Sequence, residues 1–182
     1  MPFVSDKIAF KTERLEAHFL NEDNKHFLFE LYNDATLSQH LQGLDAEKDF
    51  ALTIDCYNAN SNIGAYLIFS RNDFDDTKDF IGFGGVHNQE PLKDGSLALP
   101  DTIEFLIMID SKHARKGYAK EFSEAFLQLF FNASNHNNLM ARVSKENEPC
   151  VNLLQRLGFK HEGETIYYSE ENKFFLMRAV AI

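Results

Sequence analysis

One stretch of the chain constrains its fold more than any other, because it joins an apolar run to an amphipathic helix through a short basic loop. Residues Ile103 to Ile109 are rich in Ile, Leu, Phe and Met over the length of a strand. The helical period that begins at Gly117 places one set of apolar residues on a common face: Tyr118, Phe122, Ala125, Phe126, Leu129 and Phe130. The segment therefore predicts a strand that leads through Arg115 and Lys116 into a helix N-terminus.

A junction of this kind is suited to binding a phosphate group. The first N–H groups of a helix lack hydrogen-bond partners and the helix dipole is positive there, so a phosphate is stabilised at that end. Gly117 has no Cβ that would keep the phosphate away, and Arg115 and Lys116 add cationic donors. An ordinary strand-turn-helix junction with two solvated basic residues explains the same pattern, so this segment alone leaves both interpretations open.

A second segment carries the signals of a short helix. Asn147 is a good N-cap, Pro149 suits the first turn, and Gly158 is placed to end the helix. The apolar stripe of this helix consists of Val151, Leu154 and Leu157. Strands are expected at Leu139 to Val143, Glu164 to Tyr168 and Phe174 to Val180, with a turn at Ser169 to Asn172.

The rest of the chain adds two helices and two long loops. Asn24 to Asn33 and Asp45 to Asn58 have helical patterns, and the second begins with Asp45 as a cap. Arg71 to Asp79 and Asn88 to Pro100 are polar and lie between strand-like runs, as hairpin loops do. Because no linker or repeat interrupts the 182 residues, we expect a single domain over residues 1–182.

Four segments have an order and spacing that identify a family. They are Thr12 to Leu15 (TERL), Phe80 to Val86 (FIGFGGV), Lys116 to Glu121 (KGYAKE) and Asn147 to Phe159 (NEPCVNLLQRLGF). Together they resemble the GNAT superfamily of acyl-CoA N-acyltransferases, and within it the RimJ/RimL-like branch. The first two look like the opening strand and the central hairpin strand of that branch. The third resembles its KGYAxE acyl-CoA signature, and the fourth its NEASIRVLEKLGF helix.

The sequence also departs from that branch at defined positions. The pyrophosphate loop of the family usually reads Q/R-x-x-G-x-G/A, whereas Ala114 stands at the Q/R position and Arg115 replaces a further glycine that is often present. Leu106 and Ile107 stand where the branch often has Gly-Tyr, and Cys150 takes the place of a serine. The loop, the substrate side of the strand and the helix are therefore the places where this chain differs from its relatives.

The resemblance implies an α/β (α+β) GNAT fold, with a mixed, mostly antiparallel sheet of about seven strands and about four helices. Acetyl-CoA, as cosubstrate, would lie between splayed strands at Ile107 to Ile109 (with Met108 between them) and Leu139 to Val143. Its pantetheine arm would lie near Asn147. Its pyrophosphate would bind to Arg115, Lys116, Gly117, Tyr118 and Ala119. Direct acetyl transfer to an amine would follow.

Catalysis requires a base, because an amine must be neutral to attack a thioester and a typical alkylamine is protonated near pH 7. Glu104 is the candidate, since the branch often has glutamate at this position at the start of the acetyl-CoA strand. Such a base would act directly or through water. A solvated carboxylate at the strand end and a charge that binds the acceptor are the alternatives for Glu104.

A proton or hydrogen bond for the departing CoA thiolate is the second requirement. In RimL-like enzymes the serine at the place of Cys150 has been assigned this role, and a thiol can donate near neutral pH. The alternative is that Cys150 is a small buried hydrophobic residue. Many other GNAT members use a tyrosine one turn later, where this chain has Leu154, which cannot donate.

The acceptor implied by the resemblance is a protein N-terminal amine, such as that of a ribosomal protein, or a small amine. Tyr32, His40 and Tyr57 lie in or near the two early helices and are candidates for contacting the acceptor; packing in the core or at the rim is the alternative for each. A different kind of function also fits: an acyl-CoA-binding sensor or interaction module that has kept the fold and lost turnover, given the altered loop and the missing tyrosine.

Composition excludes several other functions. A formal net charge of −10 opposes binding to nucleic acid, and no run approaches the roughly 20 apolar residues of a membrane span. Cys56 and Cys150 form no C-x-x-C motif and the histidines are scattered singly, so no metal site is expected. Because the first 20 residues also lack the apolar core of a signal peptide, we expect a cytoplasmic protein. A monomer or homodimer is expected.

Overall fold

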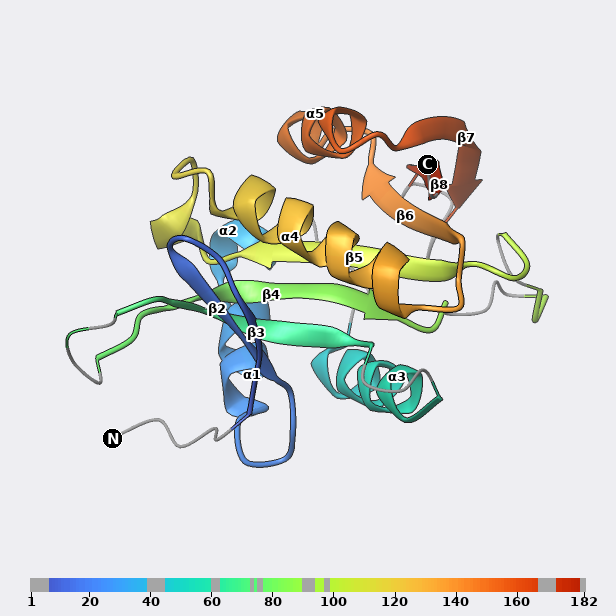
Figure 1. The fold of residues 1–182 in the computed structure, drawn as a ribbon. Coiled ribbons are helices and arrows are strands. Elements are labelled where there is room, and N and C mark those ends of the chain that lie inside the picture. The colour runs from blue at the N-terminus through green and yellow to red at the C-terminus, as the bar shows by residue number, and fades with distance from the viewer. Residues whose placement is uncertain are drawn as a thin grey trace.

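The computed structural model describes residues 7–38, 45–59, 63–72, 74, 77–89, 94–96, 99–166 and 173–180. Within them one sheet has eight strands in the order β1-β2-β3-β4-β5-β6-β8-β7. The strands are β1 (Ile8–Lys11), β2 (Leu15–Phe19), β3 (Ala65–Ser70), β4 (Phe80–His87), β5 (Ile103–Ile109), β6 (Asn138–Ser144), β7 (Lys160–Ile166) and β8 (Lys173–Val180). The helices are α1 (His26–Tyr32), α2 (Ala35–Ser38), α3 (Ala46–Ala59), α4 (Tyr118–Ala133) and α5 (Glu148–Arg156), with a 3-10 helix η1 at Ser111–His113. Figure 1 shows their arrangement.

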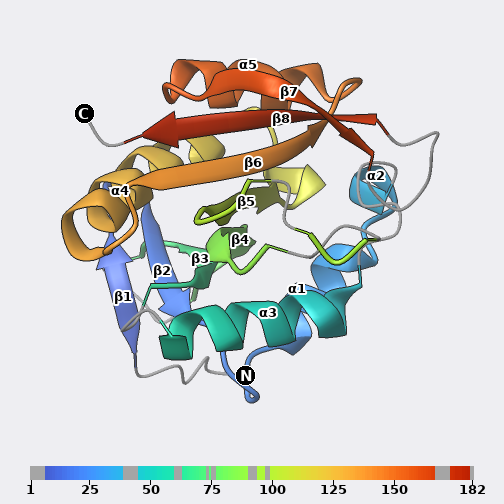
Figure 2. The ribbon, with the colours of Figure 1, turned by 90° about the vertical axis from the view of Figure 1, so that its right-hand side faces the viewer.

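The helices lie on both faces of the sheet (Figures 1 and 2). One core, under α4 and α5, contains Phe122 and Leu154, and a second, under α1 and α3, contains Leu28 and Phe50. The mixed and mostly antiparallel architecture expected from the sequence is confirmed. In the described part of the chain, no helix is long and apolar enough to cross a membrane.

Helix α4 is held against the sheet by a row of phenylalanines. Phe122, Phe126 and Phe130 recur at helical spacing and are fully buried, and burying a side chain of this size contributes roughly 1.5–3 kcal/mol. Gly84 on β4 allows the close approach, because a Cβ there would lie 2.7 Å from Cε1 of Phe122. The glycines of the central strand therefore set how closely α4, and with it the β5–α4 loop, lies against the sheet.

The paired region between the parallel strands β5 and β6 is short, so the sheet opens between these two strands. The only paired residues of the two strands are Ile103 with Leu139 and Glu104 with Met140, although β5 continues to Ile109 and β6 to Ser144. Every other pair of neighbouring strands is antiparallel. The two strands therefore separate toward their carboxyl ends, as the predicted splay requires.

The structure corrects one prediction, which concerns the opening strand. Thr12 to Leu15 was expected to be the opening strand, but Thr12, Glu13 and Arg14 form the turn of a β1–β2 hairpin, and only Leu15 belongs to a strand. Two hydrogen bonds close this turn: the N–H of Thr12 to the carbonyl of Leu15 (2.9 Å) and the N–H of Leu15 to Oγ1 of Thr12 (3.0 Å). The extra hairpin strand raises the number of strands above the expected seven.

Several local predictions are confirmed within a few residues. Asn147 caps α5, because its Oδ1 accepts a hydrogen bond from the N–H of Cys150 (3.3 Å), and Asp45 caps α3 by accepting from the N–H of Lys48 (3.0 Å). Gly158 follows α5 with a left-handed φ of 91°. The strand expected from Glu164 begins earlier, at Lys160, since the pairing with β8 already includes Lys160 opposite Arg178. Tyr168 and the turn at residues 169–172 lie outside the described residues.

Candidate active site

The β5–α4 junction has the strand-loop-helix geometry predicted from the sequence. The loop begins at η1, where the Asp110 side chain accepts a hydrogen bond from the N–H of Lys112 (3.0 Å). Its backbone then takes left-handed φ angles at Arg115 (62°) and Gly117 (81°), and α4 starts at Tyr118. A left-handed residue costs a non-glycine side chain roughly 1–2 kcal/mol. Arg115 therefore has a left-handed backbone conformation that favours glycine. The family that the sequence resembles often has a glycine at this position.

The start of α4 has the features of an anion-binding site. Gly117, its N-cap residue, supplies no side-chain hydrogen bond to the first N–H groups of the 16-residue helix, which an anion can satisfy. Nearby, Nζ of Lys116 lies 3.5 Å from Nδ1 of His113. Burial, followed by the charges of Lys116 and Lys112, lowers the pKa of His113, so its imidazole is neutral at pH 7. The positive charge of the loop is thus carried by its lysines and Arg115.

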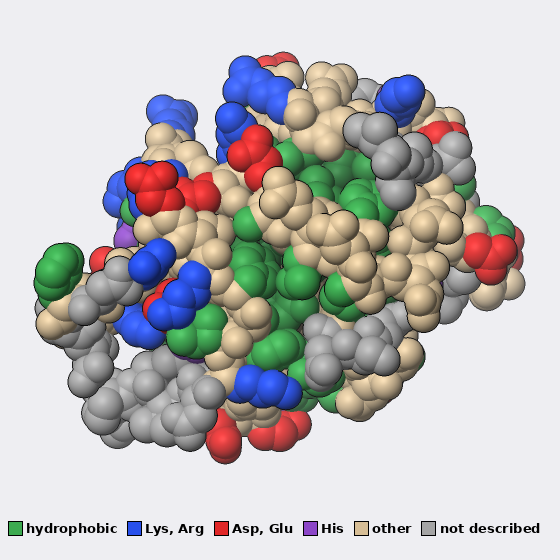
Figure 3. Space-filling model, viewed as in Figure 1, with side chains coloured by type: hydrophobic (Ala, Val, Ile, Leu, Met, Phe, Trp, Pro, Cys, Tyr) green, Lys and Arg blue, Asp and Glu red, His purple; other side chains and the backbone are tan. Residues whose placement is uncertain are grey.

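A hollow of about 410 Å³ lies beside this helix start, between α4 and α5. It is lined by Lys120, Glu148, Pro149, Asn152, Leu153 and Arg156. Lys120 belongs to the first turn of α4, and Arg156 to the last turn of α5. Figure 3 shows Lys and Arg side chains gathered at the upper left of the view, where Figure 1 places the β5–α4 loop and one end of α5. The hollow therefore has two cations, Lys120 and Arg156, and one carboxylate, Glu148, in its lining.

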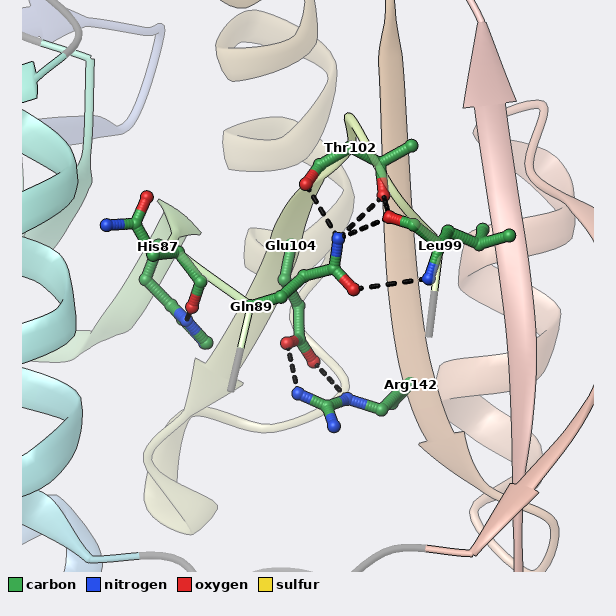
Figure 4. Close-up of polar contacts among 7 residues, drawn as sticks. His87, Gln89, Leu99, Thr102, Glu104 and Arg142 are labelled. Carbon is green, nitrogen blue, oxygen red and sulfur yellow. Dashed lines mark hydrogen bonds and ion pairs between the residues drawn. The ribbon is translucent and has the colours of Figure 1, made fainter. Parts of the chain in front are cut away.

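Glu104 lies where β5 and β6 separate, and it is held by a residue that the sequence analysis missed. Nε of Arg142, on β6, donates to Oε1 of Glu104 at 2.8 Å, and Nη2 donates to Oε2 (Figure 4). The two side chains are only 3% and 9% exposed. The alternative that Glu104 is a solvated carboxylate is therefore wrong. Arg142 was detectable only as a single charged residue within an apolar strand.

Two further polar side chains lie at the end of β4 beside Glu104 (Figure 4). His87 is the cross-strand partner of Glu104, and its Nδ1–H donates to the carbonyl of Asn88 at 2.6 Å, because a carbonyl oxygen can only accept. Nε2 of Gln89 donates to Oγ1 of Thr102 (2.8 Å) and to the carbonyls of Thr102 (2.7 Å) and Leu99 (2.6 Å). Gln89 thereby fixes the segment that leads into β5.

Cys150 lies in the first turn of α5 and packs against the core under α4. Burial raises the pKa of its thiol from 9.0 to about 11. The thiol is therefore protonated at neutral pH. Transfer of its proton to an ordinary thiolate, with a pKa of about 8.5, is unfavourable, whereas donation of an S–H hydrogen bond needs no transfer.

The predicted acceptor contacts lie in different surroundings. The hydroxyl of Tyr32, on α1, donates to Oδ2 of Asp49 on α3, and Tyr32 packs against the core under α1 and α3. Asp49 is thus a buried carboxylate on the wall opposite the α4 face, and the sequence analysis missed it. Tyr57 packs instead on Phe19, with ring centroids 5.1 Å apart. His40 lies outside the described residues.

Comparisons with known proteins agree with this geometry. The model of the acetyltransferase (GNAT) domain family matches residues 14–160. A GnaT-family acetyltransferase from Bordetella pertussis has 18% identity and a TM-score of 0.75, with 94% of this chain and 98% of that chain covered. The ribosomal-protein-S5-alanine acetyltransferase from Vibrio fischeri has 16% identity and a TM-score of 0.70, covering 96% and 97%. Spermidine N-acetyltransferase from Vibrio cholerae, solved with CoA and spermine, has 19% identity and a TM-score of 0.65, covering 91% and 95%.

The family match spans most of the chain, and the solved structures share its fold. A comparison with curated protein sequences gave no match. The protein belongs to the GNAT acetyltransferase family and is an N-acetyltransferase.

Proposed function

We propose that the protein transfers the acetyl group of acetyl-CoA directly to a primary amine, with the CoA pyrophosphate bound at the start of α4. The observation that supports this most is that two features lie together at the carboxyl end of β5. The strands β5 and β6 separate after Glu104. The loop after β5 leads into the N-terminus of α4, which has no side-chain cap. An opening for an extended arm thus lies beside a site for its phosphates.

The residues for CoA follow from this arrangement. The backbone N–H groups and cations of residues 115–119 would hold the pyrophosphate. Beyond Glu104 the β6-side edge of β5 is open, so Ile107, Met108 and Ile109 can offer backbone groups to the amides of the pantetheine arm. Asn147 uses its Oδ1 as a helix cap, and its amide nitrogen would contact the same arm. The adenosine and its 3′-phosphate would occupy the hollow between Lys120 and Arg156.

Glu104 is the base in this proposal, and it acts through a water molecule. The Glu104 side chain is buried and each of its oxygens binds Arg142, so we place a water molecule between the carboxylate and the acceptor amine. Arg142 would keep the carboxylate in one orientation at the opening between β5 and β6. His87, the cross-strand partner of Glu104, would help to orient the same water.

Cys150 donates an S–H hydrogen bond to the departing CoA thiolate in this proposal. Its raised pKa, about 11, keeps the proton on the thiol throughout. A covalent acetyl-cysteine does not fit, because a thiol with a raised pKa is a poor nucleophile at neutral pH. Cys150 therefore contributes by hydrogen bonding, and its share of the rate is modest.

We propose a protein N-terminal amine or a polyamine as acceptor, and membership of the RimJ/RimL-like branch. The similar structures include enzymes named for a ribosomal-protein alanine and for spermidine. A net charge of −10 and the buried Asp49 on the α1/α3 wall both favour a cationic acceptor. The cytoplasmic location expected from the sequence stays a prediction.

The test is to follow CoA release with a thiol reagent across N-terminal dipeptides, ribosomal-protein peptides and polyamines. Cys56 is fully buried and the pKa of Cys150 is raised, so background reaction with the protein should be slow. We expect turnover with at least one of these amines. Tight CoA binding without turnover on any of them would instead identify the protein as a sensor.

A further inference from the structure

The turn of the β1–β2 hairpin lies against the start of α4, although more than 100 residues separate them in the sequence (Figure 1). The carboxylate of Glu121, in the first turn of α4, accepts three hydrogen bonds from this turn. They come from Oγ1 of Thr12 (2.5 Å), the backbone N–H of Arg14 (2.8 Å) and Nε of Arg14 (2.7 Å). Each carboxylate oxygen is engaged, so the hairpin and the helix are fixed to one another at this point.

The same arginine also contacts the loop itself. Nη1 of Arg14 donates to the backbone carbonyl of Lys116 at 2.9 Å. Its guanidinium carbon lies 4.6 Å from the ring centroid of Tyr118, and Nη2 lies 3.4 Å from the point where a Cβ on Gly117 would stand. One side chain thus touches three consecutive residues at the start of α4.

The contact with the Lys116 carbonyl matters for an anion site. An anion is bound by N–H groups and repelled by carbonyl oxygens, so the peptide group between Lys116 and Gly117 must keep its carbonyl away from the anion. Gly117, which follows this peptide, has a left-handed φ, as does Arg115 one residue before Lys116, and a glycine leaves the adjoining peptide group free to take more than one orientation. A hydrogen bond from a charged donor is well suited to select one of them.

Glu121 in turn orients the guanidinium. Burial acts to raise the pKa of Glu121, but the hydrogen bonds from Thr12 and Arg14 and the charge of Arg14 outweigh it, so the pKa is lowered and the carboxylate stays ionised. A lone negative charge in the first turn of α4 would repel a phosphate. Arg14 neutralises that charge while it holds the carbonyl.

We propose that Arg14 is a positioning residue for CoA: it holds the Lys116 carbonyl outward and so keeps the N–H groups at the start of α4 directed at the pyrophosphate. This inference rests on the proposed function. It assigns to the TERL turn a role in binding the cosubstrate, carried by Arg14 and supported by Glu121.

The test compares a ligand that has the pyrophosphate with one that lacks it. CoA affinity is measured by calorimetry, and transfer is measured with acetyl-CoA and with S-acetyl-pantetheine. Arg14→Ala should weaken CoA binding about ten-fold or more, the usual effect of losing a hydrogen bond from a charged donor. Its kcat/KM with S-acetyl-pantetheine should stay within about two-fold of wild type, since that substrate makes no use of the loop.

Two further variants make the test specific. Arg71→Ala is the matched control, because Nη1 of Arg71 donates to the carbonyl of Thr12 (3.1 Å) and so supports the same turn from the end of β3; its CoA affinity should match wild type. Arg14→Lys covers the case in which Arg14→Ala does not fold. A lysine keeps the charge but lacks the planar fork by which Arg14 reaches Glu121 through Nε and the Lys116 carbonyl through Nη1, so CoA binding should again be weakened.

The outcomes separate the inference from the function on which it rests. Unchanged CoA affinity in folded Arg14→Ala or Arg14→Lys would overturn the positioning role, and so would an equal loss with acetyl-CoA and S-acetyl-pantetheine. If wild type bound no CoA at all, the proposed function itself would fail.

Discussion

The two ends of the candidate site are built differently. At the β5–α4 loop the proposed binding groups are backbone N–H groups and exposed cations, and Arg14 from a distant hairpin contacts the loop backbone. At the separation of β5 and β6 the functional groups are buried side chains, where Arg142 binds both oxygens of Glu104. The first end is suited to hold a charged ligand, and the second to place one carboxylate at a fixed point.

This difference implies that mutations at the two ends should have different consequences. A backbone site tolerates changes of side chain unless they block or repel the ligand, so its variants should fold and lose affinity. A buried ion pair depends on both partners, so removing one leaves an uncompensated charge and lowers the stability of the fold. Stability should thus respond to changes at the Glu104–Arg142 pair, and CoA affinity to changes in the loop.

The largest expected effect is on stability. Arg142→Met should lower the free energy of unfolding by about 3–5 kcal/mol, because it leaves the Glu104 carboxylate buried without its cation. The double variant Glu104→Gln with Arg142→Met should recover much of this loss. Denaturant unfolding measures both, with Arg156→Met on the surface of α5 as control. A loss in Arg142→Met no larger than in the control would remove the contrast between the two ends.

The next effect concerns the role of the carboxylate in the reaction. Glu104→Gln keeps the shape and removes the base, so transfer should fall by about 100-fold at the acidic end of the pH profile. The loss should shrink as pH rises, because more of the acceptor amine is then already neutral. The measurement is kcat/KM against pH, beside a thermal melt. A uniform loss at every pH would assign Glu104 to structure or to acceptor binding.

The smallest effect is expected at Cys150. Cys150→Ala should lower kcat about five-fold with little change in CoA affinity, because it removes one weak hydrogen bond. Cys150→Ser should retain most of the activity. Steady-state kinetics on both variants measures this. Equal, near-wild-type turnover in the two would leave Cys150 as a packing residue.

The raised pKa of the Cys150 thiol also predicts that the free energy of unfolding depends on pH. Its folded pKa of about 11 lies above the ordinary 9.0, so the stability that the neutral thiol contributes is complete below pH 9 and is lost as pH rises toward 11. Unfolding experiments across this range should show a steeper decline in wild type than in Cys150→Ser. Parallel declines would indicate that the thiol does not titrate with unfolding.

The parts of the fold that could be predicted are those specified by local sequence. The strand-loop-helix junction and the Asn147 cap follow from residues within a few positions of one another, and both are confirmed. The Glu104–Arg142 pair spans 38 residues and depends on the parallel register of β5 and β6. The contact between Arg14 and Glu121 spans 107 residues. Neither pairing leaves a local signal, because the sequence shows each charged residue but not which distant residue it contacts.

The error at Thr12 to Leu15 has the same origin. A family motif places these residues correctly in the chain, but it does not show that the Thr12 side chain closes a turn with Leu15. The apolar and polar pattern of four residues fits a strand as well as a turn. Only the pairing of β1 with β2 decides between the two.

The central claim is that the start of α4 binds CoA, and calorimetric titration of CoA into three proteins tests it most directly. Gly117→Asp would place a side chain and a negative charge at the loop, whereas Gly95→Asp makes the same change at a glycine with nearly the same φ, 82° against 81°, and no neighbouring atom within 4 Å. We expect wild type and Gly95→Asp to bind CoA equally, and Gly117→Asp to bind at least about 100-fold more weakly. Equal affinity in all three folded proteins would contradict the claim.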